Sequence, residues 1–246
     1  MIPDDRTAAT RSQTDVVIQG IKDMLTRGEL HPGSRLPVEK DLAAQLGVSR
    51  GSLREGVRAL ATLGVLETRQ GDGTYVTSLD PRRLLSPLGF LADLQQPAHA
   101  ADLLAVRRVL EAESAALAAP RLADDDLAEL DRILGVVDGI LADDPDMDLE
   151  AFIDADTEFH RIIARASGNP ALAAVIDTLV GRTFRARLWR AISHRGSVRE
   201  TQAEHRAILA ELVARDPERA RLRMSVHLLG VEEFSAAHAD EDPHAG

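Results

Sequence analysis

The sequence contains one clear β-hairpin signal among apolar patterns that are otherwise helical. The signal is the stretch "GVLETRQGDGTYV" at 64–76, in which two short strand-like runs flank a Gly-Asp-Gly turn. Before it, and again from residue 99 onward, apolar residues recur at helical spacing. We therefore expect a mainly α fold, with helices and a small hairpin first and an all-α antiparallel bundle after them.

Breakers bound the helices that precede the hairpin. Helical spacing in "TDVVIQGIKDMLTRGEL" predicts a first helix, which "HPGSRLP" ends. "VEKDLAAQLG" predicts a short second helix, and Ser49 can cap a third helix that runs to Gly64. This order is that of a winged helix-turn-helix, which we expect over residues 10–78, here called the head. In that geometry the start of the third helix enters the DNA major groove.

The start of the third helix has the sequence "SRGSLRE" at 49–55. Arg50 and Arg54 project from about one face and can reach phosphates or a guanine edge. The hydroxyls of Ser49 and Ser52 can bond phosphate oxygens, and the positive end of a helix favours an anion. Ordinary solvated arginines are the alternative for either arginine alone. The whole pattern favours DNA as the anion.

The formal net charge of −11 is unevenly distributed along the chain. Residues 1–80 carry a balance of −1 and the rest of the chain −10, so the acidic part repels nucleic acid and leaves the head to approach it. The absence of cysteine excludes disulfides and thiolate metal sites. The sequence shows neither a secretory signal nor an apolar run of membrane-spanning length. We expect a cytoplasmic protein without a membrane partner.

The stretch from Leu30 to Val76 resembles the DNA-binding domain of the GntR family of bacterial transcription regulators. The pieces "PGSRLP", "LGVSR", "LRE", "LGVLE" and "GTYV" occur in the family's order. Two residues depart from the pattern: Val38 replaces a helix-capping serine, and Asp72 places a negative charge at the wing tip, which weakens the expected wing contact. The resemblance implies DNA contacts from Arg35, Ser49, Arg50, Ser52, Arg54, Gly71 and Gly73.

Residues 99–240, here called the body, follow a connector at 79–98 in which we expect one short helix. Turn-forming stretches such as "SGNP" and "ARDPE" separate the predicted helices of the body. No segment of 20–50 residues repeats, which excludes a solenoid. The predicted helices run approximately over 100–118, 123–142, 148–166, 171–192, 197–214 and 216–237.

Four polar residues fall on or beside the apolar faces of these helices. At 100° per residue, Asp156 lies inside the apolar arc of its helix and His160 at the edge of that arc. His205 and His227 align with apolar residues of the last two helices. A buried carboxylate without a partner is costly. The four side chains could form a hydrogen-bonded cluster, but together they favour a site for Zn²⁺, Ni²⁺ or Mn²⁺.

The body also resembles the FCD ligand-binding domain of the FadR subfamily within the GntR family. The resemblance rests on "DTEFH", on "EH" before "RAIL" and on "VH" in the last long helix. It implies that one divalent metal ion per chain is bound, and that a small organic acid completes the coordination of the metal. By position, the implied ligands are Asp156, His160, His205 and His227.

Two further residues match effector-binding positions of that domain, Arg107 and Asn169. Arg107 falls close to the apolar stripe of its helix, so it is either paired with Glu111 at i+4 or a clamp for a ligand carboxylate. Asn169 in "SGNP" is equally well explained as a turn residue. Arg185 and Arg187 are candidates without a decisive pattern.

These features predict a transcription regulator that acts as a homodimer on a palindromic double-stranded DNA operator. A small carboxylate bound at the metal would change operator affinity, and repression relieved by the effector is the commoner mode of the family. The alternatives are an acyl-CoA-responsive regulator without metal, a DNA-binding protein whose body only dimerises, and a metal-dependent hydrolase. Glu204 points about 100° away from His205 on the wheel and is a poor general base, so we predict that the chain is not an enzyme.

Overall fold

A computed structural model describes residues 12–85, 87, 100–142, 148–194 and 196–238. The chain divides into two compact units, residues 1–87 and 88–246, which contain the head and the body respectively. Of the predicted connector, residues 81–85 are helical, whereas residues 88–98 lie outside the described part.

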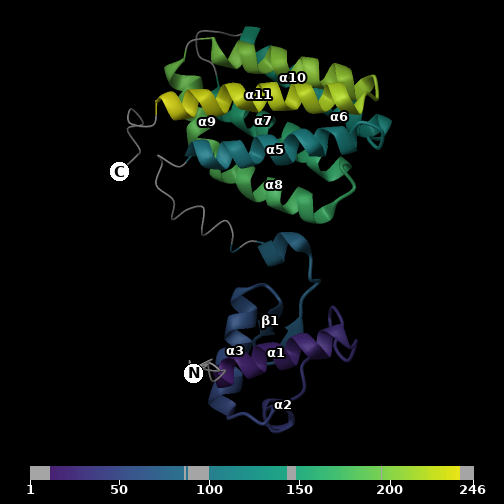
Figure 1. Cartoon of the computed structure of the whole chain (residues 1–246), viewed down its shortest axis with the longest axis vertical. Helices are drawn as coiled ribbons and strands as arrows, with labels where there is room; N and C mark the ends of the chain where they lie inside the picture. Colours follow the sequence, from purple (N-terminus) through teal and green to yellow (C-terminus); the bar gives the residue numbers. More distant parts are fainter. Residues whose placement is uncertain (1–11, 86, 88–99, 143–147, 195, 239–246) are drawn as a thin grey trace, which may run out of the picture. The chain divides into compact units, whose positions relative to one another are not determined.

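The head contains the three predicted helices, and local capping explains where they begin (Figure 1). Ser49 Oγ accepts a hydrogen bond from the backbone N–H of Ser52 at 3.0 Å and so caps the third helix. Val38 gives the second helix no side-chain cap. Gly47 ends that helix at φ 67°, which favours glycine. The helices are α1 (Gln13–Thr26), α2 (Glu39–Leu46) and α3 (Arg50–Thr62).

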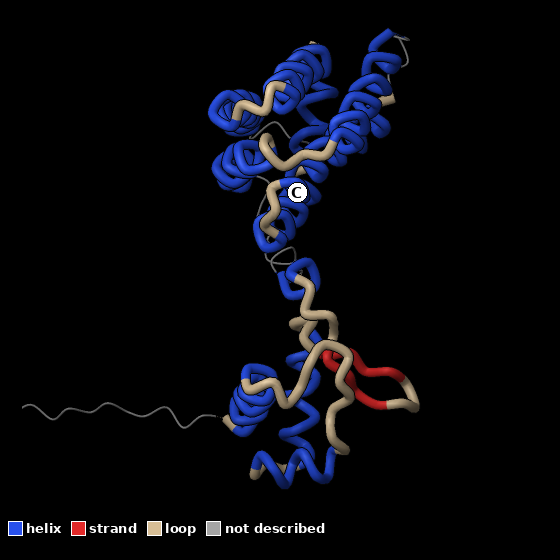
Figure 2. Tube along the Cα trace, turned by 90° about the vertical axis from the view of Figure 1, so that its right-hand side faces the viewer, coloured by secondary structure: helices blue, strands red, loops and turns tan. Residues whose placement is uncertain are grey.

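A two-stranded antiparallel hairpin follows α3, drawn in red in Figure 2. Strands β1 (Leu66–Arg69) and β2 (Gly73–Val76) pair with Leu66 opposite Val76. The segment before α2 adds to this sheet, since the N–H of Leu36 donates to the carbonyl of Thr74 at 2.8 Å. The hairpin is thus the predicted wing of a winged helix-turn-helix.

Apolar side chains from all three helices and both strands fill the centre of the head. The close approach of α1 and α3 depends on Gly56, because a Cβ there would lie 2.5 Å from Val17 Cγ1. Helical spacing alone does not show that Gly56 faces this contact. The most deeply buried core residues include Val17, Ile21, Leu42, Leu53, Leu66 and Val76.

The body is all helical over its described residues, as predicted. One boundary was wrong: the helix expected at 171–192 is two helices that meet at Thr183. The buried Thr183 hydroxyl donates to the carbonyl of Leu179 at 3.2 Å, and such local bonds compete with helix continuation. The helices are α5 (Ala100–Ala118), α6 (Asp124–Ala142), α7 (Leu149–Ala166), α8 (Pro170–Arg182), α9 (Phe184–Ser193), α10 (Ser197–Val213) and α11 (Pro217–Ala237).

Helices α5 and α11 lie side by side and antiparallel (Figure 1). Two ion pairs join these helices: Arg108 Nε donates to Glu232 at 2.8 Å, and Arg221 donates to Glu113 at 3.0 Å. The main apolar core lies between α5, α6, α7, α10 and α11, and Phe159 of α7 is fully buried within it. The polar residues of the candidate site project from these same helices and from α9.

Candidate metal and effector site

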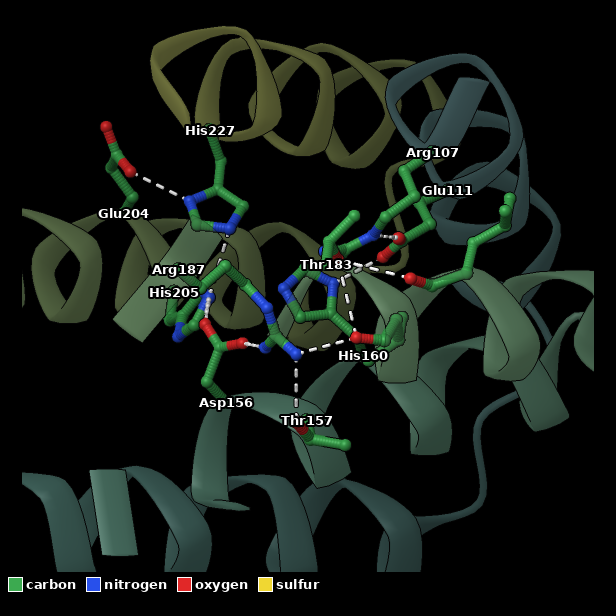
Figure 3. A network of polar contacts seen from close by, with 12 residues as sticks. Arg107, Glu111, Asp156, Thr157, His160, Thr183, Arg187, Glu204, His205 and His227 are labelled. Carbon is green, nitrogen blue, oxygen red and sulfur yellow. Dashed lines mark hydrogen bonds and ion pairs between the residues drawn. The ribbon is translucent and has the colours of Figure 1, made fainter. Parts of the chain in front are cut away.

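Three helices bring the four predicted metal ligands together in the interior of the body. Asp156 and His160 come from successive turns of α7, His205 from α10 and His227 from α11 (Figure 3). All four are buried, and one possible ligand atom from each lies within 4.8 Å of the others. The ring of Phe159 stacks on His205 at 4.4 Å between centroids, which helps to fix that imidazole. The fold therefore brings together the four residues that the sequence predicts as ligands.

The donor atoms converge in a way that fits a metal ion. His205 Nε2 lies 3.3 Å from His227 Nε2 and 3.6 Å from the Asp156 carboxylate. His160 Nε2 is buried and has no hydrogen-bond partner among the described residues. A buried nitrogen in that state is costly unless something else bonds it. Three imidazole nitrogens and one carboxylate oxygen suit a divalent transition metal.

Further charged groups contact three of the four ligands, as Figure 3 shows. His160 Nδ1 lies 2.5 Å from a Glu111 oxygen, and His227 Nδ1 lies 2.8 Å from a Glu204 oxygen. An imidazole that donates through Nδ1 keeps the Nε2 lone pair for a metal, and carboxylates commonly play this part in metal sites. Arg187 bonds the Asp156 oxygen that does not face His205.

Burial keeps two of the imidazoles neutral. It lowers the pKa of His205 well below the usual value, and the neighbouring His227 adds to the effect. Burial lowers the pKa of His227 to about 4, although the bond from Glu204 works in the opposite direction. Burial would raise the pKa of Glu111, but Arg107 and His160 lower it well below the usual value. Near neutral pH the two imidazoles are therefore free to bind a metal, and Glu111 is ionised.

Arg107 is fully buried and forms the ion pair anticipated from sequence. Its Nε donates to Glu111 at 2.6 Å, and Nη1 donates to Thr183 at 2.6 Å. Its Nη2 has no hydrogen-bond partner within the part of the chain that the structure describes. The ion pair and the clamp are thus compatible, because one guanidinium nitrogen is still available to a ligand.

Three of the four candidate ligands, Asp156, His160 and His227, border a small cavity of about 20 Å³. That volume holds roughly one water molecule, so an organic acid can enter only if lining side chains move. Asn169 does not line this cavity; it is exposed and caps α8, accepting hydrogen bonds from two backbone N–H groups. The lining residues include Arg107, Phe152, Asp156, His160, Arg187, Arg190, Thr201 and His227.

Three contacts of this site were not predicted from the sequence. Arg187 had no decisive pattern because the helix expected from the sequence ran through the break at Thr183. Arg185, the other candidate there, has a side chain outside the described residues. Glu111 was considered only as a partner of Arg107, whereas it also contacts His160. Glu204 points away from His205 on α10, and its carboxylate contacts His227 of α11 instead.

The head brings several predicted DNA contacts to one exposed region. A groove of about 640 Å³ between α2, α3 and the wing is lined by Arg35, Arg54, Gly71 and Gly73. Arg35 lies over Gly73, where a Cβ would be 2.8 Å from its Nε. Arg54 is paired with Glu39, with Nη2 2.9 Å from a carboxylate oxygen.

The remaining predicted contacts lie at the start of α3, where Ser49 and Arg50 are exposed and Ser52 is half-buried. At the wing tip, Tyr75 donates its hydroxyl hydrogen to Asp72 at 2.9 Å. The Asp72 carboxylate, which departs from the family's pattern, is therefore fixed by a hydrogen bond from a residue of β2.

Two family models account for the two units. The model described as bacterial regulatory proteins, gntR family, matches residues 13–76, and the FCD domain model matches residues 102–230. The chain belongs to the GntR family. It is a DNA-binding transcription regulator with a C-terminal FCD domain, and the predicted winged helix-turn-helix and helical body are confirmed.

Individual relatives agree with this assignment. The HTH-type transcriptional regulator LutR of Bacillus subtilis is 32% identical over 224 residues, covering 89% of this chain and 99% of LutR. The HTH-type transcriptional repressor NanR of Klebsiella aerogenes is 29% identical over 231 residues, covering 92% of this chain and 86% of NanR. The solved structure of Streptococcus agalactiae GntR is 30% identical, with a TM-score of 0.63 over 90% of this chain and 99% of that chain.

The family bears on the other predictions as well. GntR regulators bind DNA and small-molecule effectors, FCD domains commonly bind metal, and the similar proteins are transcription regulators. No helix within the described ranges has the length and apolarity needed to cross a membrane.

Proposed function

We propose that this regulator binds one divalent transition metal ion per chain at Asp156, His160, His205 and His227, and that a small carboxylate effector binds beside it. The buried His160 Nε2 without a hydrogen-bond partner carries the proposal, because a metal ion supplies the missing bond. Two of the three imidazoles, those of His160 and His227, contact Glu111 and Glu204 through Nδ1, which leaves their Nε2 atoms for the metal. Zn²⁺, Ni²⁺ and Mn²⁺ all suit this ligand set.

The bound ion would act as a Lewis acid that accepts an oxygen of the effector carboxylate. The chain itself contributes a positive charge, because Nη2 of the buried Arg107 is available to the effector carboxylate. Effector entry requires a rearrangement, because the cavity of about 20 Å³ is too small for an organic acid. An effector that binds only the rearranged body shifts its population and can thereby change operator affinity.

The DNA-binding arrangement that we propose is a homodimer on a palindromic operator, because paired recognition helices read two related half-sites. Repression relieved by the effector is the proposed mode, in line with the relative named as a repressor. The proposed DNA contacts are Arg35, Ser49, Arg50, Ser52, Arg54, Gly71 and Gly73. Analytical ultracentrifugation of the full chain, alone and with selected DNA, tests the dimer; a monomer in both samples contradicts it.

Metal content tests the site itself. The wild-type protein, purified without tag or chelator, is expected to hold about one metal ion per chain by mass spectrometry, and His227→Ala is expected to lose it. His194→Ala is the matched control, because the His194 side chain is 49% exposed and lies outside the four-residue cluster. If wild type takes up neither Zn²⁺ nor Ni²⁺ nor Mn²⁺, the four side chains form a hydrogen-bonded cluster and the metal proposal is wrong.

A further inference from the structure

The interior of the body holds more positive than negative charge before any metal is counted. Among the described residues, every buried arginine and every buried carboxylate belongs to this one site. The three cations are Arg107, Arg187 and Arg190, and the two anions are Glu111 and Asp156. Burying charge without compensation is costly, so the excess calls for an anion.

The balance of charges at the site indicates how many negative charges the bound anion carries. Glu204, which is paired with His227 and partly exposed, can offset the one excess cation. A divalent metal at the four ligands then leaves an excess of two. A monocarboxylate neutralises one of these charges and leaves the other buried, whereas a dicarboxylate neutralises both.

Arg190 offers a place for the second negative group. It comes from α9, is 9% exposed, and donates from Nη1 to the neutral Thr201 hydroxyl at 3.1 Å. Its ion-pair partner is Glu200 at 3.7 Å, whose side chain is 58% exposed and well solvated, and the charge of Glu204 also acts on it without a direct ion pair. This buried guanidinium is therefore only weakly compensated by the protein.

One cavity connects Arg190 to the candidate metal ligands. Asp156, His160 and His227 line it together with Arg190, Ser197 and Thr201. Apolar side chains complete the wall and suit the carbons between two carboxylates. They are Phe152, Ala191, Leu228 and Val231.

We propose that the effector is a short dicarboxylate, with one carboxylate at the metal and Arg107 and the other at Arg190 and Thr201. This inference rests on the proposed metal-dependent function and adds the effector's charge and the residue that selects it. The small cavity favours a short acid, and Arg190 acts as a specificity-determining residue. An acid with a neutral group in place of the second carboxylate leaves Arg190 uncompensated and binds more weakly.

Matched acids test the charge without any mutation. The zinc-loaded full-length protein is titrated with succinate, glutarate and L-malate, with the monoamide of each, and with L-lactate. Calorimetry and the fluorescence of Trp189, the single tryptophan, report binding. Each monoamide keeps the shape of its acid and lacks one charge. At least one dicarboxylate is expected to bind roughly tenfold or more tightly than its monoamide, the scale of a charged hydrogen bond.

Arg190→Gln tests the residue. It is expected to keep the metal, to bind the monoamides within about twofold of wild type and to lose the preference for the dicarboxylate. Arg108→Gln is the control, since Arg108 pairs with Glu232 and does not line the cavity. If Arg190→Gln does not fold, the comparison of acids and monoamides in the wild type still decides the charge of the effector.

The possible failures are distinct. Equal affinity for each acid and its monoamide, or a preference that survives in folded Arg190→Gln, overturns the dicarboxylate inference and leaves the carboxylate effector intact. If none of the acids, including L-lactate, binds the zinc-loaded protein, the carboxylate effector itself is wrong and the inference falls with it.

Discussion

The head and the body each contain an arginine–glutamate pair, and the two pairs lie in opposite surroundings. Arg54 and Glu39 of the head have side chains that are 62% and 52% exposed, whereas Arg107 and Glu111 of the body are 0% and 3% exposed. Water can replace either partner of the exposed pair at little cost, so Arg54 could exchange Glu39 for a DNA phosphate if it makes the proposed contact. Neither partner of the buried pair has that option. The same two residue types therefore form a pair that solvent can separate in the head and a fixed pair in the body.

The sharpest way to break this comparison is to remove the buried carboxylate. Glu111→Gln leaves Arg107 buried without its anion and removes the charge beside His160, so it is expected to lower the free energy of unfolding by about 3–5 kcal/mol. Urea denaturation followed by circular dichroism measures the change. Glu113→Gln is the control on the same helix, because Glu113 is exposed and bonds Arg221 at the surface. Equal, small effects of both substitutions would show that the buried pair is not special.

A smaller effect is expected on the DNA side. Arg50→Ala removes an exposed cation at the start of α3 and is expected to weaken DNA binding by about 1 kcal/mol or more, without changing stability. Fluorescence anisotropy with a DNA fragment selected by the wild-type protein measures the affinity, which should fall steeply with salt in both proteins. Arg27→Ala, which removes an exposed arginine paired with Glu29 beyond α1, serves as control. Unchanged binding by Arg50→Ala would remove α3 from the DNA interface.

The smallest effect concerns the exposed pair itself. Glu39→Gln releases Arg54 and removes a negative charge beside α3, so DNA affinity is expected to rise roughly twofold to fivefold while the midpoint of thermal unfolding stays nearly constant. The comparable change at the other exposed pair, Glu29→Gln, should alter neither quantity. A large loss of stability in Glu39→Gln would mean that the pair holds α2 on α3, which contradicts the exchange role.

The sequence predicts which face of each helix is buried. It does not predict which residues of other helices pack against that face. The hairpin, the three head helices and the inward positions of Asp156, His160, His205 and His227 follow from spacing and breakers, which are local properties of the chain. Which side chain meets which across two helices depends on packing. For that reason the contact of His227 with Glu204 and that of Asp156 with Arg187 appear only in the structure.

The break at Thr183 was also hidden from the sequence, because the residues on both sides have good helical spacing. The hydroxyl of Thr183 bonds carbonyls of α8 and receives a bond from Arg107, which lies 76 positions earlier in the chain. A local pattern cannot report a partner at that distance along the chain.

This break has a consequence for how effector preference can diverge among related regulators. Helix α9 begins anew at Phe184 and carries Arg187 and Arg190, while all four candidate metal ligands lie on other helices. Each residue inserted or deleted at the junction rotates α9 by about 100° relative to its neighbours. A single length change there would turn both arginines away from the cavity and present other side chains, with the metal ligands untouched. If the body binds a metal ion and an organic acid as proposed, the junction would let the choice of acid change independently of the choice of metal.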